Sequence, residues 1–245
     1  MENDGVVIEE SVQSQEQKLP DPVSMSKGTY QIIRNNQEIK FTLETPFEIS
    51  KTLITQKLYS SVMGNDRNVS YFRGDNRPVE NVTFFDTIEF CNKLSLKNGF
   101  LSVYTIDNDK VSYNHNVTGF RLPFEIEWEC CLGGDIIEIE KELDKIAWYN
   151  SNSNGQTRDV GLKEASCYGV FDLLGNVWEW CFDCYRDDHP LIPVLEGDNN
   201  LRVIKGGSFL NFTTMFTNKY AFRKKRGPLA KEKYIGFRVV LQNNN

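Results

Sequence analysis

Two tryptophans on either side of a single glutamate, in the segment Gly175–Trp180 (GNVWEW), constrain this chain more than any other feature of its sequence. A carboxylate among aromatic rings is costly to bury unless a metal ion, an arginine or a set of backbone N–H groups compensates its charge. Arg121 and Arg238 are candidate partners for Glu179. The segment therefore predicts a built site, either structural or functional, around this carboxylate.

The composition favours one domain with a sizeable core and argues against nucleic-acid binding. The chain has 245 residues, of which 40% are hydrophobic, and its formal net charge is −6. Residues 1–24 hold six acids and one lysine, a net charge of −5, which leaves only −1 for the remainder. A nearly neutral body offers no electrostatic attraction to a phosphate backbone, and the four bases of Arg223–Arg226 are too few to form a patch.

The two ends of the chain are predicted to lie outside the folded domain. Residues 1–27 are polar and acidic, a composition typical of a flexible tether, and residues 243–245 are predicted to be a disordered tail. No apolar run approaches the length of about 18 residues that a membrane-spanning helix needs, and no basic segment followed by an apolar one indicates a signal peptide. The single domain is expected to span residues 28–242.

Local patterns predict an α+β fold in which short strands and helices are joined by long loops. Helices are predicted to begin at Thr55, Thr83 and Pro123 and to end at Gly64, Gly99 and Gly133. Strands or a hairpin are predicted over 30–39, 41–49, 104–113, 202–204 and 236–241. In the third helix, Phe124, Trp128 and Cys131 form the predicted buried stripe. The stretch 148–207 is long and rich in Gly, Asn, Asp and Ser, which is typical of a functional or externally fixed loop.

Six cysteines, at positions 91, 130, 131, 167, 181 and 184, are too few for a disulfide scaffold in a chain of this length. Cys181 and Cys184 have the CxxC spacing of a redox pair, but such a pair needs a helix N-terminus. Here the motif follows the tryptophan-rich stretch instead. We therefore interpret these two cysteines as packing residues or as an incidental disulfide.

Seven segments carry a family resemblance: Phe47–Lys51, Asn76–Glu80, Asp86–Cys91, Phe120–Glu129, Phe171–Trp180, Arg202–Phe209 and Gly236–Val240. In this order they resemble the formylglycine-generating-enzyme family, also called sulfatase-modifying factor domains. One such segment is a weak signal, whereas seven in order over residues 41–241 are specific. The resemblance implies a variant of the C-type-lectin fold, in which a mixed, twisted sheet is combined with a few helices and much irregular loop.

Enzymes of this family oxidise a target cysteine with oxygen through two cysteine thiolates that hold copper, because copper(I) prefers sulfur ligands. The resemblance places these thiolates at Asn211 and Phe216, neither of which can bind copper, and no cysteine follows Cys184. A related branch uses an iron ion held by three histidines, but this chain has two histidines in total. The resemblance therefore predicts a member without copper or iron, and a role other than catalysis.

The family also has a structural calcium site, which the resemblance places at Asp172, Gly175, Val177 and Glu179. These residues offer two carboxylates and two backbone carbonyls, and waters would complete the roughly six to eight oxygens that calcium takes. The alternative is that Glu179 pairs with Arg121 or Arg238 and that no metal binds. Both alternatives stay open from the sequence. A second calcium site, near Asn150 and Ser151, has no convincing carboxylate.

In this family the segment 209–234 lines the substrate groove. The residues predicted to bind a ligand there are Phe209, Asn211, Phe212, Phe216, Tyr220 and Arg223. Tyr, Phe and Arg side chains anchor many interfaces, so the segment favours recognition of a protein, a peptide or a small molecule without chemical change. One alternative is that half of the aromatic residues belong to the core and that the basic run is a solvated loop.

A second alternative is an enzyme with a different chemistry in the same groove, for which Ser208, Asn211, Tyr220 and Arg223 are candidates. They include no plausible general base, which disfavours this alternative.

Related lectin-like domains also display hypervariable surfaces in this segment, which is an analogy of fold only. The resemblance further implies an exported or membrane-tethered protein. His189 lies in an acidic loop and is predicted to be solvated.

Overall fold

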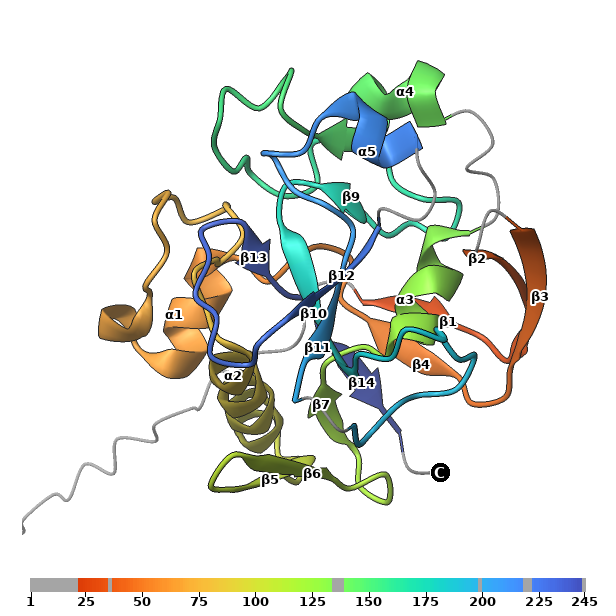
Figure 1. The fold of residues 1–245 in the computed structure, drawn as a ribbon. Helices are drawn as coiled ribbons and strands as arrows, with labels where there is room; N and C mark the ends of the chain where they lie inside the picture. The colour runs from red at the N-terminus through yellow and green to blue at the C-terminus, as the bar shows by residue number, and fades with distance from the viewer. Residues whose placement is uncertain (1–21, 35–36, 134–138, 198–199, 218–221, 244–245) are drawn as a thin grey trace, which may run out of the picture.

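The computed structural model describes residues 22–34, 37–133, 139–197, 200–217 and 222–243, so most of the predicted tether and part of the predicted tail lie outside the described residues. Short strands from distant parts of the sequence form two four-stranded sheets, and helices and long loops surround them (Figure 1). This arrangement confirms the predicted α+β class. Among the described residues, no helix combines the length and the apolar character needed to cross a membrane.

The first sheet brings the two ends of the described chain together. Its strands, in order, are β1 (Val23–Met25), β4 (Phe47–Ile49), β14 (Val240–Gln242) and β7 (Gly119–Arg121), with antiparallel neighbours throughout. Met25 is buried in the core. The folded domain therefore begins by Val23, before the predicted boundary at residue 28. The sequence did not indicate this strand, because its three residues are too few to change the acidic and polar composition of the surrounding segment.

The second sheet contains the tryptophan-rich segment. Its strands, in order, are β12 (Arg223–Arg226), β11 (Arg202–Lys205), β10 (Trp178–Cys184) and β13 (Ile235–Gly236). β10 runs antiparallel to β11 and parallel to β13, and all of its residues are buried. The single strand predicted over 236–241 is wrong, because the chain passes from one sheet to the other between β13 and β14.

Three two-stranded ribbons complete the described β structure: β2 (Gly28–Arg34) with β3 (Gln37–Leu43), β5 (Tyr104–Asp107) with β6 (Lys110–Tyr113), and β8 (Ala147–Trp148) with β9 (Leu174–Gly175). The hairpin predicted over 104–113 is confirmed, with Asn108 at a φ of 52° in its turn. The strands predicted over 30–39 and 41–49 have wrong bounds, since each of them joins parts of two successive strands.

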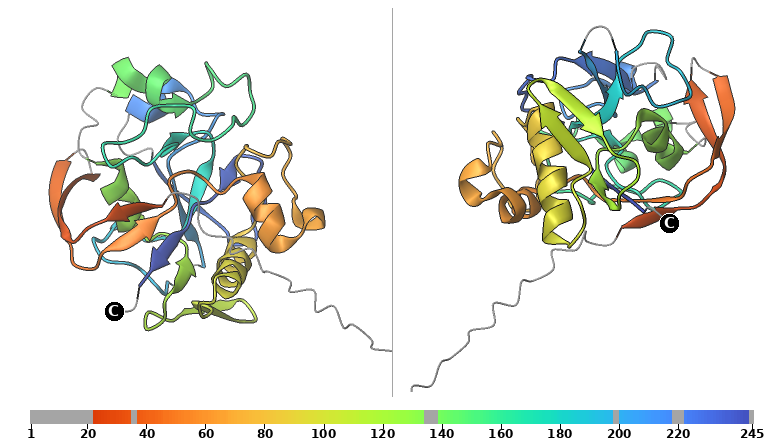
Figure 2. Two further views of the ribbon diagram at one scale, coloured as in Figure 1. Left: turned by 180° about the vertical axis from the view of Figure 1, so that it is seen from behind. Right: turned by 90° about the horizontal axis from the view of Figure 1, so that it is seen from below.

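The helices are α1 (Gln56–Met63), the short 3-10 helix η1 (Asn65–Arg67), α2 (Phe84–Lys97), α3 (Glu125–Leu132), α4 (Ile139–Ile146) and α5 (Thr213–Thr217). Thr55 caps α1 by accepting the Leu58 N–H, and Thr83 caps α2 by accepting the Asp86 N–H, as predicted. The Asp86 carboxylate also accepts the Thr83 N–H, which completes a capping box. α4 and α5 were not predicted. α1 and α2 lie on one side of the second sheet and the β2–β3 ribbon on the other (Figure 2).

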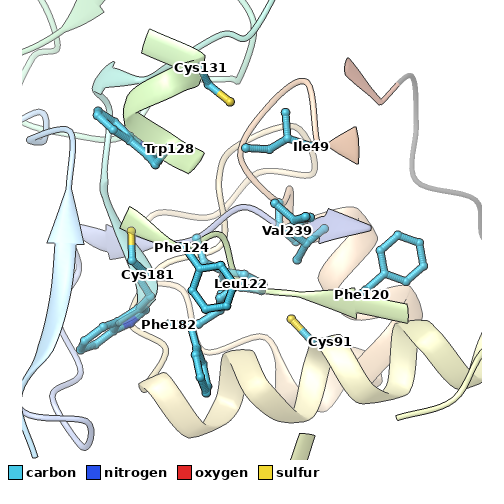
Figure 3. Packing of buried hydrophobic residues seen from close by; sticks show 14 of the residues in the cluster. Ile49, Cys91, Phe120, Leu122, Phe124, Trp128, Cys131, Cys181, Phe182 and Val239 are labelled. Carbon is cyan, nitrogen blue, oxygen red and sulfur yellow. The ribbon is translucent and has the colours of Figure 1, made fainter. Parts of the chain in front are cut away.

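The core centres on α3 and β10 (Figure 3). Trp128 and Cys131 of α3 are fully buried, as predicted, and Phe124 is the N-cap residue of the helix. Trp180 of β10 is also fully buried, and its indole N–H donates to the Val82 carbonyl oxygen at 3.1 Å. The helix also buries three carboxylates that its apolar stripe did not predict: Glu125, Glu127 and Glu129. Each of them requires a compensating partner.

Candidate functional site

The Glu179 carboxylate, at the centre of the tryptophan-rich segment, is held by Arg238. Arg238 Nε and Nη2 lie 2.5 Å and 2.9 Å from its two oxygens, and both side chains are fully buried. The other candidate, Arg121, instead pairs with Glu127 through contacts of 2.6 Å and 2.7 Å. A bidentate guanidinium therefore supplies the positive charge that the buried carboxylate requires.

Asp172, the second carboxylate predicted to bind calcium, receives hydrogen bonds from neutral donors. It is buried and accepts from the Gly161 N–H at 2.7 Å and from the Asn176 side-chain amide at 3.4 Å. Burial raises the pKa of Asp172 and of Glu179. When both are ionised, two buried carboxylates face one guanidinium, that of Arg238. The resulting excess of negative charge is compatible with a bound cation.

The four predicted calcium ligands lie in one buried segment. Asp172 and Gly175 have φ values of 55° and 82°, and a Cβ at Gly175 would lie 2.2 Å from the Trp148 carbonyl oxygen, so glycine is required there. Val177 directly precedes β10 and is fully buried. This set fits calcium only in part, because both Glu179 oxygens already accept hydrogen bonds from an arginine.

The two positions that the resemblance assigned to copper ligands carry side chains that serve packing. Asn211 Oδ1 accepts hydrogen bonds from the Ser208 backbone N–H and hydroxyl, at 2.8 Å and 2.9 Å. Phe216 of α5 is fully buried in a cluster with Tyr149 and Phe222. Neither the Asn211 amide, which is hydrogen-bonded to Ser208, nor the buried Phe216 ring contains sulfur, so neither is a soft ligand for copper.

The residues predicted to bind a ligand do not share one surface. Phe209 and Phe216 are fully buried, so the prediction is wrong for these two: their rings complete the core instead of facing solvent. Phe212 is 66% exposed and remains available to a ligand. Tyr220 lies outside the described residues. Aromatic residues serve both as core and as interface anchors, and the sequence alone did not separate the two uses.

The residues considered for a different chemistry are engaged in other contacts. Ser208 is buried, and its hydroxyl bonds to Asn211 instead of to a base. Arg223 Nε donates to Glu125 Oε1 of α3 at 2.8 Å. In the part of this segment that the structure describes, no nucleophile lies beside a general base.

Two segments that meet at the contact between Phe72 and Phe209 carry partly or largely exposed apolar side chains. We call these side chains the aromatic surface: Val69, Tyr71, Phe72, Leu210 and Phe212. The rings of Tyr71 and Phe72 are 4.8 Å apart, and Phe72 packs edge-on against Phe209 at 5.4 Å. Tyr71 is 67% exposed. The sequence pointed to Phe212 but not to Tyr71, because the Gly, Asn and Asp content of residues 65–78 indicated a loop and nothing more.

A buried carboxyl group fixes the backbone of the aromatic surface. Glu80 is fully buried, and its Oε1 accepts the Phe72 N–H at 2.8 Å. No described residue donates a hydrogen bond to its Oε2. Burial raises the pKa of Glu80 to about 7. The protonated form therefore holds this loop in place without the penalty of a buried charge.

Two of the buried glutamates of α3 belong to a group that we call the charge cluster: Arg34, Glu125, Glu129, His189, Lys205 and Arg223. Lys205 Nζ lies 3.2 Å from Glu125 Oε1 and 2.9 Å from Glu129 Oε1. Arg34 Nε donates to Glu129 Oε2 at 2.7 Å. Burial opposes ionisation of both carboxyls, but Lys205 and the other cations outweigh it and lower their pKa values.

His189 belongs to the charge cluster, which corrects the prediction of a solvated side chain. Its side chain is 14% exposed, and Nε2 lies 3.0 Å from Glu125 Oε1 and 3.2 Å from Glu129 Oε1. One ligand atom from each of these three groups falls within 4.8 Å of the others, a spacing that suits a metal ion. The Lys205 ammonium contacts the same two oxygens, so the protein supplies its own cation at this place.

The cysteines of the CxxC motif are packing residues. Cys181 and Cys184 are buried and form no disulfide, and Cys184 Sγ contacts the Leu195 carbonyl oxygen at 3.6 Å. Burial raises the pKa of both thiols. A thiol that stays protonated at neutral pH is a poor nucleophile, so this motif does not provide a redox centre.

Removal of the Arg238 guanidinium should destabilise the fold strongly, because Glu179 would remain in the core without a compensating charge. We expect Arg238→Met to lower the free energy of unfolding by about 3–5 kcal/mol, measured by urea denaturation at neutral pH. The double variant Glu179→Gln/Arg238→Met should recover part of this loss. Equal destabilisation of the single and the double variant would show that the ion pair is not the cause.

Stability should depend on pH through Glu80. Its pKa rises from an ordinary value of 4.5 to about 7 in the fold, so between these values the folded chain binds more protons than the unfolded chain. Its stabilising contribution is complete below the lower value and is lost as the pH rises through the upper one. We expect wild-type protein to lose stability relative to Glu80→Gln over this range, measured by denaturation at several pH values. Glu44→Gln, at an exposed position, is the control; the same pH dependence in both variants would contradict the assignment.

The sequence model of the family described as sulfatase-modifying factor enzyme 1-like domain matches residues 8–243. The chain is 31% identical over 229 residues to the chaperone protein LppX of Paenibacillus barcinonensis, which covers 78% of this chain and 79% of that protein. It is 30% identical over 161 residues to the formylglycine-generating enzyme of Thermomonospora curvata. That match covers 54% of this chain and 52% of the enzyme, so the chain spans about half of the enzyme's length.

Solved structures show the same fold. Treponema denticola variable protein 1 superposes with a TM-score of 0.79 at 29% identity, covering 91% of this chain and 95% of that one. PvdO from Pseudomonas aeruginosa shares the fold with a TM-score of 0.72 at 20% identity, covering 91% and 94%. These similarities confirm the formylglycine-generating-enzyme-like variant of the C-type-lectin fold. The chain therefore belongs to the family of sulfatase-modifying factor enzyme 1-like domains.

Proposed function

We propose that this chain is a non-catalytic binding protein that recognises segments of other polypeptides. One observation carries the proposal: Asn211 and Phe216 stand where the resemblance places the two thiolates of the family's oxidase, and both side chains are committed to packing. Copper-dependent oxidation requires soft sulfur ligands that converge on one ion. A fold that keeps its framework without these ligands retains surfaces for recognition but not the oxidation chemistry.

The aromatic surface is the best candidate for recognition. Tyr71 and Phe212 are large, rigid and two-thirds exposed, and aromatic side chains of this kind contribute much of the binding energy at protein interfaces. The two segments that carry these side chains meet where Phe72 packs against Phe209, which favours one binding surface. Lys233 Nζ lies 5.0 Å from the centre of the Tyr71 ring, so a positive charge borders the apolar residues.

The similarity to a protein named as a chaperone favours a polypeptide as the partner. That relative matches over most of both chains, whereas the match to the formylglycine-generating enzyme covers about half of each. Partly folded proteins expose apolar segments, which make them prone to aggregation. We therefore propose that the aromatic surface binds such segments. Export or membrane tethering of this chain, which the resemblance implies, stays a prediction.

The wild-type protein should slow the aggregation of an unfolding test protein, followed by light scattering. We expect Tyr71→Ser/Phe212→Ser to lose most of this protection, because hydroxyl groups replace the apolar contacts. Leu101→Ser changes an exposed leucine just beyond α2 and should protect as well as the wild type does. Equal protection by both variants would exclude the aromatic surface as the binding site.

The proposal that the protein is not a copper-dependent oxidase is tested by incubating it with copper, oxygen and a cysteine-containing peptide and measuring loss of the peptide thiol. The peptide thiol should be lost no faster with the protein than without it, because Asn211 and Phe216 provide no sulfur ligand. Loss of the thiol that requires both the protein and oxygen would overturn the proposal.

We further propose that calcium binds beside Asp172 and stiffens the loop that leads into β10. The carboxylate of Asp172 and the backbone carbonyls of Gly175 and Val177 are the candidate ligands, and calcium accepts both kinds of oxygen. Two buried carboxyl groups, Asp172 and Glu179, lie near the single positive charge of Arg238, which supports this proposal because a cation would compensate the second carboxylate. Glu179 contributes its charge here, since its oxygens already bind the guanidinium.

Calcium should raise the melting temperature of the protein. A ligand at 100 times its dissociation constant stabilises the folded state by roughly 2.7 kcal/mol, which corresponds to a shift of about 5–10 °C for a chain of this size. Thermal unfolding in calcium and in a chelator measures the shift. Asp172→Asn should abolish it, whereas Asp109→Asn, at an exposed turn, should not. An identical melting temperature in calcium and in chelator would remove the metal from the proposal.

A further inference from the structure

β12 is the outermost strand of the second sheet and consists of four consecutive bases, Arg223, Lys224, Lys225 and Arg226 (Figure 1). It pairs with β11 along one edge, and no strand in the described part of the chain pairs with its other edge. An unpaired edge presents backbone N–H and C=O groups that can extend the sheet. Arg223 belongs to the charge cluster, but neither the core nor the aromatic surface accounts for the other three bases, Lys224, Lys225 and Arg226.

The register of the β11–β12 pair identifies the backbone groups that point outward. The Gly206 N–H donates to the Phe222 carbonyl oxygen at 3.1 Å, and opposed residues alternate between bonded and non-bonded pairs along an antiparallel ladder. The even-numbered residues of β12 therefore bond to β11, whereas the N–H and C=O groups of Arg223 and Lys225 face away from the sheet. In agreement, the Lys225 carbonyl oxygen accepts a hydrogen bond from a side chain, Arg226 Nη1, at 2.9 Å.

Most of the positive charge on this edge is not neutralised by the described residues. Lys224 and Lys225 are exposed, and Asp187 Oδ1 lies 4.0 Å from Lys225 Nζ. Arg226 donates to a backbone carbonyl and to a tyrosine hydroxyl, which are neutral. The whole chain has a net charge of −6. The edge of β12 is therefore a local concentration of positive charge on an acidic protein.

Aromatic rings restrict the lysine side chains at this edge. Lys225 Nζ lies 4.7 Å from the centre of the Tyr185 ring, and Lys224 Nζ lies 5.0 Å from that of Trp178. Cation–π contacts of this kind limit side-chain freedom, so less conformational entropy is lost when an anionic partner binds. Partial burial lowers the pKa of Lys224, and repulsion by the Arg226 guanidinium lowers it further. A bound carboxylate would relieve that repulsion.

We propose that the outer edge of β12 binds an extended, carboxylate-rich segment of a partner protein as an additional strand. The outward backbone groups of Arg223 and Lys225 form the ladder, and Arg226 turns from the Lys225 carbonyl to a carboxylate of the segment. Alternate acidic side chains then reach Lys224 and Arg226 on one face of the sheet and Lys225 on the other. This surface is separate from the aromatic surface, and the inference does not rest on the proposed function.

The positive charge and the outward backbone groups of β12 together favour an acidic polypeptide strand over a second copy of the chain or a nucleic acid. A second copy of the chain would set like charges against each other, which is how basic edge strands prevent self-association. Nucleic acid matches the charge but has no peptide groups to form a ladder. An acidic strand satisfies both requirements.

The test measures binding of a fluorescent, acetylated peptide in which Glu alternates with Val to the full chain at low salt, by fluorescence anisotropy. We expect saturable binding that Lys224→Glu/Lys225→Glu weakens about tenfold or more. Lys225→Pro removes an outward N–H without removing a bond to β11, and should weaken binding to a similar extent. Lys40→Glu/Lys110→Glu makes the same change of charge at exposed positions elsewhere, and should leave the affinity unchanged.

The peptide itself separates strand pairing from charge attraction and does not depend on how any variant folds. N-methylation of alternate residues keeps the charge but blocks the ladder, and should weaken binding about tenfold. Equal binding of the methylated peptide, or of a single-stranded oligonucleotide of the same charge, would overturn the proposal, as would full binding by Lys224→Glu/Lys225→Glu. Binding that appears only after the six acids in residues 1–24 are changed to amides would assign the edge to the chain's own N-terminal segment, and would also overturn it.

Discussion

Arg238 binds both oxygens of Glu179 in β10 and also donates to the Ser50 carbonyl oxygen at 3.2 Å and to that of Phe171 at 2.9 Å. One fully buried guanidinium thus joins the central strand of the second sheet to two loops that are distant in sequence. A buried ion pair adds little stability compared with an apolar pair of the same volume, but an arrangement that leaves one partner alone is strongly penalised. We infer that this interaction selects the observed arrangement of the two sheets over alternatives of similar packing.

Features that depend on a few neighbouring residues could be predicted from the sequence. Thr83 and its capping box act over three positions, and a Trp-Glu-Trp segment needs a charge partner in any fold. The choice of Arg238 could not be predicted, because the pair spans 59 positions and depends on which strands become neighbours. The charge cluster was missed for the same reason, since Lys205 reaches Glu129 across 76 positions. The prediction of ligand-binding residues was wrong for Phe209 and Phe216, because an aromatic side chain suits the core and an interface equally well.

The fold separates its stable framework from its surfaces. Asn211 and Phe216, the positions to which the resemblance assigns the family's thiolates, are held in the Ser208–Asn211 turn and in the Phe216 cluster. Tyr71 and Phe212 of the aromatic surface and Lys224 and Lys225 of β12 are exposed, so substitutions at these four positions disturb few buried contacts. Function on a shared fold resides in such surfaces and not in the framework. Residues on the surface of this fold can therefore change while the core remains the same.

β14 lies between β4 and β7, so the strand that is synthesised after all the others of the first sheet occupies an interior place in it. Arg238, two residues before β14, is likewise translated long after Glu179. On the ribosome, β4 and β7 therefore emerge without the strand that will separate them, and the edges that face β14 stay unpaired until residues 240–242 have been translated. Until β14 is added, these two edges can form non-native strand pairs, which is the kinetic consequence of an interior strand that lies late in the sequence.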